Sequence, residues 1–176
     1  MIRWIKWTAF VAIGAVAVHY AAVTTLPNII MWRVMSLGGA KGTNTLVHTE
    51  RSTAASRVIV KPSPDLLYSR CIYDVTHMPL TITTAAPADT YWSVALYASN
   101  TDNFYVLNDT AAKGQPATII LMGQGQSIPP QPEGTRIVTA PTSKGLILFR
   151  TLINDDARET EIDKARRTAT CEPLRP

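Results

Sequence analysis

The longest apolar stretch of the chain lies close to its N-terminus. Residues Trp7 to Leu26 contain no Lys, Arg, Asp or Glu, and Arg3 and Lys6 precede them. A helix rises about 1.5 Å per residue, so this segment covers about 30 Å, the thickness of the hydrocarbon core of a bilayer. The pattern predicts one transmembrane helix. A cleaved secretory signal is the alternative, but its apolar region usually runs only about 7 to 15 residues, so we favour an uncleaved anchor.

The basic flank of this segment predicts its orientation. Positive charge next to a first transmembrane helix stays on the cytoplasmic side, so residues 1–6 are expected in the cytoplasm and the rest of the chain outside it. Three glycines between Gly38 and Gly42 end the apolar pattern, and such a stretch cannot hold a helix. We therefore expect residues 7–26 to be followed by a membrane-proximal stalk at 27–50 and a β-rich domain at 51–176.

The remainder of the chain has the pattern of a β protein. Short runs rich in β-branched and aromatic residues are separated by Pro, Gly, Asn and Asp, which is typical of strands. In the clearest run, Trp92, Val94 and Leu96 fall on one face and the other face is more polar. With almost no helical periodicity between them, the runs predict an antiparallel β-sandwich or barrel. The predicted strands are Arg57–Val60, Ser69–Val75, Leu80–Thr84, Thr90–Ala98, Asn103–Leu107, Ala117–Met122, Thr135–Thr139 and Gly145–Leu152.

The C-terminal tail differs from the rest of this domain. Asn154 is expected to cap a helix that begins with Asp155 and Asp156, and the bases follow the acids, as the helix dipole favours. Few of its residues are apolar, so the helix is expected to be mostly exposed.

Charge and motifs narrow the classes of function. Once Arg3 and Lys6 are set aside, 15 Lys and Arg face 13 Asp and Glu. This balance, without a basic run interleaved with aromatics, argues against a nucleic-acid partner. The sequence has no GxSxG, Walker, GxGxxG or HExxH motif, and His48 and His77 stand alone. We therefore expect no metal site, no cofactor and no catalytic residue.

Two cysteines, Cys71 and Cys171, are the only ones in the chain. There is no CxxC motif, so a zinc ribbon or a thioredoxin-like motif is not available. In an oxidising compartment the two could form a disulfide that closes a loop of about 100 residues. The sequence leaves open the alternative of two unrelated thiols, one in a strand and one in the tail.

One polar group is a candidate site. Tyr68 and Asp74, together with Asp65 and Arg150, could line a polar cleft that takes a ligand. The structural interpretation, which we favour, makes Asp65 an acceptor for backbone N–H groups in its turn and Tyr68 a core aromatic. Arg150 would then satisfy carbonyls or an acidic side chain where its strand ends.

Several runs, taken in order, resemble the family called domain of unknown function 1254. They are VKPSPDLLYS, CIYDV followed by Pro79, the strand from Tyr91 to Leu96, Asn103-Phe104, Ile120 to Gly125, and TAPTSKGLILFRTLINDD. The family signature of a proline, an Asn or Ser, an Asp and Leu-Tyr-Ser is similar to Pro62, Ser63, Asp65, Leu67, Tyr68 and Ser69. The arginine of the last strand and the acidic helix after it correspond to Arg150, Asp155 and Asp156. The resemblance covers residues 45 to 175.

This resemblance implies a β-sandwich-like domain without an established activity, in the periplasm of a Gram-negative bacterium. Longer relatives carry a second domain, of unknown function 1214, and this chain departs from them by stopping at Pro176. We expect a non-enzymatic component, anchored in the inner membrane, that associates with another envelope protein, which could carry that second domain. The alternative is an enzyme or ligand-binding module acting on a small or saccharide-like molecule.

Overall fold

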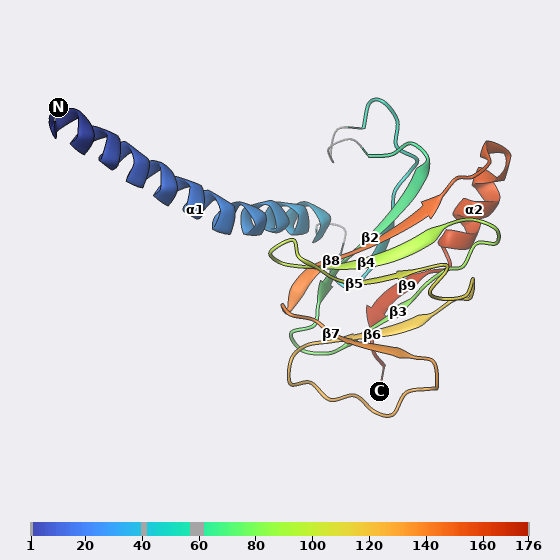
Figure 1. The fold of residues 1–176 in the computed structure, drawn as a ribbon. Helices are drawn as coiled ribbons and strands as arrows, with labels where there is room; N and C mark the ends of the chain where they lie inside the picture. Colours follow the sequence, from blue (N-terminus) through green and yellow to red (C-terminus); the bar gives the residue numbers. More distant parts are fainter. Residues whose placement is uncertain (1, 40–41, 57–61, 176) are drawn as a thin grey trace.

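A computed structural model describes residues 2–39, 42–56 and 62–175. In this part of the chain, one long N-terminal helix leads into a body of two β-sheets with a short helical segment near the C-terminus (Figure 1). The fold is the predicted β-sandwich with a C-terminal helix and a long apolar N-terminal helix. The predicted strand Arg57–Val60 falls outside the described residues.

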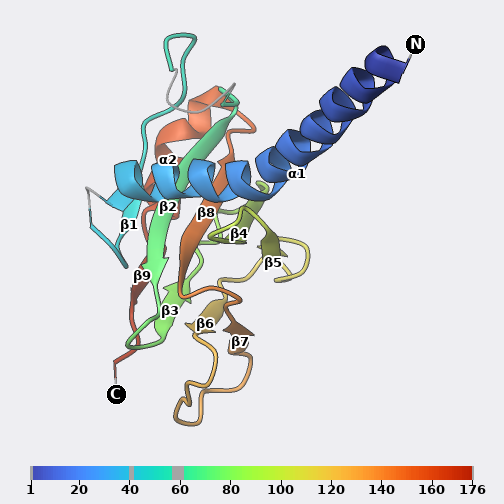
Figure 2. The same ribbon diagram turned by 90° about the vertical axis from the view of Figure 1, so that its left-hand side faces the viewer.

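The first element, α1 (Ile2–Gly39), is longer than the predicted span. Among the described residues it is the one helix long and apolar enough to cross a membrane. Pro27 lies inside it, and Figure 2 shows α1 changing direction near its middle. A proline removes a backbone hydrogen bond and crowds the preceding turn, which accounts for the bend.

The range expected as a stalk is built into the body instead. Its first part continues α1, whose second half crosses in front of the strands β2 (Leu66–Asp74) and β8 (Lys144–Leu152) (Figure 2). Gly38 approaches Ile72 so closely that a Cβ at position 38 would lie 2.9 Å from the Ile72 Cδ1 atom. The last part contains a strand that pairs with β2. The three residues of this strand are too few to display an alternating pattern.

Nine strands among the described residues form the two sheets. Sheet A has the order β1 (Leu46–His48), β2 (Leu66–Asp74), β8 (Lys144–Leu152), β4 (Trp92–Ala98) and β5 (Asn103–Asn108). Sheet B has the order β7 (Arg136–Thr139), β6 (Thr118–Met122), β3 (Leu80–Thr83) and β9 (Thr170–Pro173). All pairs are antiparallel, as predicted, except β6 and β7, which are parallel. Residues 123–135 connect these two strands and are long enough for the crossover that a parallel pair needs.

The core lies between the sheets. Ile82 of sheet B and Val94 and Ile147 of sheet A are fully buried in one cluster. Cys71 of β2 and Cys171 of β9 form a disulfide across this core, with their Cα atoms 6.5 Å apart. The bridge therefore joins one sheet to the other.

Strand β4 is buried on both faces, although the sequence predicted a more polar second face. Ser93 and Ala95 of that face are 1% and 0% exposed. Their cross-strand neighbours on β8 are Arg150 and Leu148. Because β4 is an interior strand, the longer side chains of Arg150 and Leu148 lie within contact distance of Ser93 and Ala95 and bury them.

The C-terminal tail folds into the short 3₁₀ helix η1 (Asp156–Arg158) followed by α2 (Glu159–Arg166). The cap is Asp155, whose carboxylate accepts the N–H of Ala157, and not Asn154 as predicted. Asn154 instead donates its side-chain amide to the Asp89 carbonyl at 2.6 Å. The helix α2 is less exposed than expected, because only three of its eight residues are exposed, and Ile162 and Arg166 are buried.

Candidate functional site

The four candidate residues do not converge on one site. Tyr68 and Arg150 are directly opposite each other on β2 and β8. Asp74 stands six positions further along β2, about 20 Å from Tyr68 at the rise of an extended strand. Asp65 lies in the turn before β2, with its side chain exposed. No single ligand of ordinary size can touch all four.

The turn around Asp65 is closed through its backbone and not through its carboxylate, as far as the described residues show. The Asp65 N–H donates to Ser63 Oγ at 3.3 Å, and the Asp65 carbonyl accepts the N–H of Ile153 at 2.8 Å. The Tyr68 hydroxyl accepts the N–H of Ser63 at 3.1 Å, so Tyr68 holds this turn. Tyr68 is half-buried on the outer face of sheet A and is not a core residue.

Asp74 is part of a polar cluster at the end of β2. Its carboxylate accepts hydrogen bonds from the backbone and hydroxyl of Thr76 and lies 3.1 Å from Lys144 Nζ. Burial alone would raise the pKa of Asp74, but the bonds from Thr76 and Lys144 outweigh burial and hold this pKa below its ordinary value. The group therefore stays ionised and is tied into the fold.

Arg150 is half-buried on the outer face of sheet A. The sequence predicted that it would satisfy carbonyls or an acidic side chain. Its buried Nε atom instead has no hydrogen-bond partner among the described residues. Arg150 borders a small internal cavity with Trp92 and Ser93.

A polar cluster that the sequence did not reveal joins α2 to sheet A. Arg166 is 3% exposed. It donates to the Thr49 carbonyl at 2.7 Å and to the Tyr68 carbonyl at 2.9 Å. It also donates to Ser69 Oγ at 2.8 Å and to the Asp163 carboxylate at 2.6 Å. The signal in the sequence was the spacing of Ile162 and Arg166, which places both on the buried face of α2.

Ser69 and His48 form a hydroxyl–imidazole pair in this cluster, with 2.8 Å between Ser69 Oγ and His48 Nδ1. Burial lowers the pKa of His48, and the charges of Arg166 and Arg167 lower it further. Arg166 already donates to Ser69 Oγ, so the Ser69 hydroxyl can donate to Nδ1 of a neutral imidazole.

The position of this pair does not suit a nucleophile. Ser69 is 2% exposed, and the cavity beside it holds about 10 Å³, room for about one water molecule. A substrate cannot reach the Ser69 hydroxyl. The pair is suited to holding β1 on β2.

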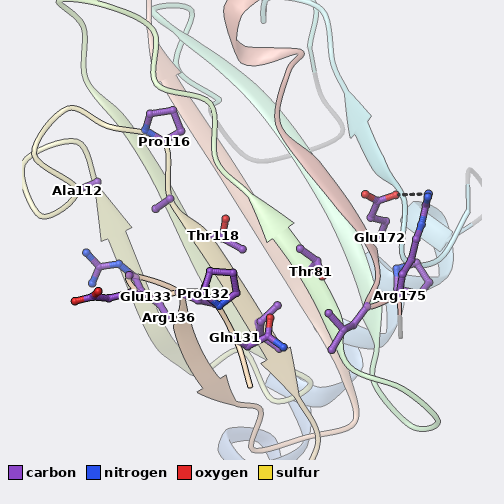
Figure 3. Close-up of a pocket in the computed structure, with 16 residues that line it drawn as sticks. Thr81, Ala112, Pro116, Thr118, Gln131, Pro132, Glu133, Arg136, Glu172 and Arg175 are labelled. Atoms are coloured by element: carbon purple, nitrogen blue, oxygen red, sulfur yellow. Dashed lines mark hydrogen bonds and ion pairs between the residues drawn. The ribbon is translucent and has the colours of Figure 1, made fainter. Parts of the chain in front are cut away.

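A larger concave surface lies on the outer face of sheet B. This groove has a volume of about 620 Å³. Its floor is made by Thr81 of β3 and by Thr118 and Ile120 of β6 (Figure 3). Ile120 points to the outer face but is only 1% exposed, because it lies at the bottom of the groove. None of the four candidate residues lines it.

The lining of the groove mixes polar and apolar groups, with charges at the two sides. Glu133 and Arg136 lie on the β7 side, while Glu172 and Arg175 lie on the opposite side and form an ion pair at 3.4 Å (Figure 3). Two acids and two bases leave no net charge in the lining. The apolar walls are formed by Pro116, Pro132, Pro173 and Leu174.

The sequence could not identify this groove, because its residues come from four strands and from the 123–135 connection. No group of three His, Cys, Asp or Glu residues that could hold a metal ion occurs in the part of the chain that the structure describes. The lining combines hydroxyl, amide, charged, proline and aliphatic groups.

Comparison with solved structures finds the same fold elsewhere. A crystal structure of the VPA0106 protein from Vibrio parahaemolyticus aligns with a TM-score of 0.70 at 9% identity and covers 88% of this chain and 37% of that one. A putative uncharacterized protein from Burkholderia cenocepacia aligns with a TM-score of 0.49 at 15% identity, covering 66% of this chain and 33% of the other. The chain thus spans about a third of the length of both.

No curated protein matches the sequence. The family model described as "Protein of unknown function (DUF1254)" matches residues 43–173, close to the range over which the motifs resemble that family. The match begins after α1 and contains both sheets and α2. The chain belongs to the DUF1254 family of proteins of unknown function.

Proposed function

We propose that this chain is a non-enzymatic domain, anchored in the inner membrane by α1 and placed in the periplasm, that binds another envelope protein through the groove on sheet B. The observation that carries the proposal is the position of the groove. The second half of α1 lies on sheet A, and sheet B is the other layer of the sandwich (Figure 1). The residues that line the groove lie on the outer face of sheet B. An anchored domain of this shape leaves the groove free to meet a partner.

The composition of the groove favours a protein partner. Thr81 and Thr118 offer hydroxyl contacts, the prolines and Leu174 offer aliphatic contacts, and the charges at the sides balance. The groove carries no net charge that would attract a strongly charged ligand. A protein segment with mixed apolar and polar groups would match its lining. The separation of Asp65, Tyr68, Asp74 and Arg150 argues in the same direction, because these residues form no common pocket.

The partner that best fits is one carrying the domain of unknown function 1214, which follows this domain in longer relatives. The groove on sheet B would then be the surface on which the two domains meet.

The proposal is tested by photo-crosslinking in cells. A photoreactive residue at Thr81, on the groove floor, is expected to capture an envelope protein that carries the second domain. The same residue at the exposed Ala157 of η1 serves as the control and should not capture it. Filling the groove with Thr118→Arg should abolish the adduct without changing the melting temperature.

Two results would contradict the proposal. One is equal capture from Thr81 and Ala157, which would mean nonspecific contact. The other is an adduct that survives Thr118→Arg, which would place the contact elsewhere. Recovery of a bound small molecule from the groove would favour the ligand-binding alternative.

A further inference from the structure

The second half of α1, residues 27–39, has one face on the protein and one that the described chain leaves uncovered. Met31 is 5% exposed, and Gly38 lies against Ile72 of sheet A. Large apolar side chains remain on the uncovered sides, each more than half exposed. They are Ile29, Ile30, Trp32 and Leu37.

This uncovered surface continues from the membrane-spanning part of the helix. No charged residue occurs from Trp7 to Trp32, and the first is Arg33. At about 1.5 Å per residue this stretch covers about 39 Å, whereas the hydrocarbon core of a bilayer is about 30 Å thick and each headgroup layer adds about 5 to 7 Å. About 9 Å of apolar helix is therefore left at the level of the headgroups.

The uncharged polar side chains of this region find partners within the helix. Thr25 donates to the Ala21 carbonyl at 2.7 Å, Asn28 to the Thr24 carbonyl at 3.1 Å and Ser36 to the Trp32 carbonyl at 2.8 Å. Such bonds satisfy side-chain donors without water, as a helix in contact with lipid requires.

Trp32 and Arg33 fit a position at the membrane interface. Indole rings are enriched at the level of the headgroups, where their apolar body and polar N–H are both accommodated. An arginine beside such a ring can extend its guanidinium to lipid phosphate while its stem stays in apolar surroundings.

We propose that residues 27–39 lie in the headgroup layer of the periplasmic leaflet, between sheet A and phospholipid. The β-sandwich then rests on the membrane through α1, and no stalk separates the two. The groove on sheet B faces away from the lipid. This inference rests on the membrane anchor proposed above, and a second chain packed on the same helix face is the outcome it must be distinguished from.

The test places one tryptophan reporter on this half of the helix in the full chain. With Trp4→Phe and Trp7→Phe, the remaining tryptophans are Trp32 and the buried Trp92. In phosphatidylcholine vesicles brominated on the acyl chain near the headgroup, Trp32 fluorescence is expected to fall severalfold relative to unbrominated vesicles. The matched control adds Trp32→Phe and Ile137→Trp to this variant. Residue 137 is 56% exposed on sheet B, so the emission of the control protein should not change in the brominated vesicles.

Three results overturn the inference. The first is Trp32 emission that bromolipid leaves unchanged and aqueous iodide quenches, which would place this face in water. The second is quenching by bromolipid that rises as the protein is diluted into more lipid, which would mean that a second chain covers the face. The third is failure of the protein to float with vesicles in a density gradient, which would show that α1 does not anchor the chain in a membrane. Crosslinking at Thr81 tests the groove independently of these three results.

Discussion

Arg166 has a larger role in the fold than its place in a charged helix suggests. Its buried guanidinium donates to the carbonyls of Thr49 and Tyr68 and to Ser69, and Asp163 balances its charge. Arg166→Ala would leave these buried groups without partners and is expected to lower the free energy of unfolding by about 3 to 5 kcal/mol.

The matched control is Arg167→Ala. Arg167 also pairs with Asp163, at 2.7 Å, but its side chain is 43% exposed, so water screens this pair and its loss should cost far less than the loss of Arg166. Unfolding of the full chain in mild detergent, followed by circular dichroism, measures both. Equal losses for the two variants would contradict the role assigned to Arg166.

The same cluster predicts a dependence on pH. Burial alone would raise the pKa of Asp163, but the interactions with Arg167 and Arg166 hold it below its ordinary value. A carboxyl with a lowered folded-state pKa stabilises the fold when ionised, and this contribution is lost as the pH falls through that pKa. The stability difference between the wild type and Asp163→Asn should therefore be full above about pH 5 and shrink below about pH 4. A difference that is constant with pH would exclude this contribution.

The candidate residues illustrate what single positions in a sequence can tell. Tyr68 and Arg150 lie opposite each other because they occupy paired positions on two neighbouring strands. Asp65 and Asp74 were added because they lie near Tyr68 in sequence, but a strand carries residues apart by about 3.3 Å per position. The Arg166 cluster was missed because two of its four partners are backbone carbonyls, which leave no trace in residue types.

At the level of elements, strands with alternating patterns were predictable and those without were not. Seven predicted strands correspond to β2 through β8 with shifts of a few residues at their ends. Strands β1 and β9 have only three and four residues, and they exist because β2 and β3 supply their hydrogen-bonding partners. The parallel pairing of β7 with β6 depends on the path of residues 123–135, which strand propensity does not encode.

Besides its hydrogen bonds to β3, strand β9 is held to the other sheet by the disulfide, and this bond gives a prediction at the level of elements. The disulfide from Cys171 to Cys71 closes a separation of 100 residues. In the chain-entropy model such a bridge contributes up to about 4.7 kcal/mol, so Cys71→Ala combined with Cys171→Ala is expected to lower stability by several kcal/mol. Mass analysis of the unreduced full chain should find no free thiol. Two alkylatable cysteines under native oxidising conditions would contradict the bridge.

At the scale of the whole molecule, the length and patterning of the chain were enough to predict a long apolar helix and a single β-rich body. The way they meet was not predictable. The glycines were interpreted as a stalk, whereas Gly38 lets α1 approach Ile72 closely. A small residue that breaks a helix and one that permits close packing look the same in a sequence, and only the position of sheet A distinguishes them.

The orientation of this molecule in the membrane is the last prediction. Arg3 and Lys6 precede the apolar span, and the next charge in α1 is Arg33. Two bases on one side against one on the other favour a cytoplasmic N-terminus, so alkaline phosphatase fused after Pro176 should be active, because it matures only in an oxidising compartment. Arg3→Gln combined with Lys6→Gln should invert part of the chains and lower this activity severalfold. An inactive wild-type fusion, with a cytoplasmic reporter active at the same site, would reverse the topology and turn the groove on sheet B toward the cytoplasm.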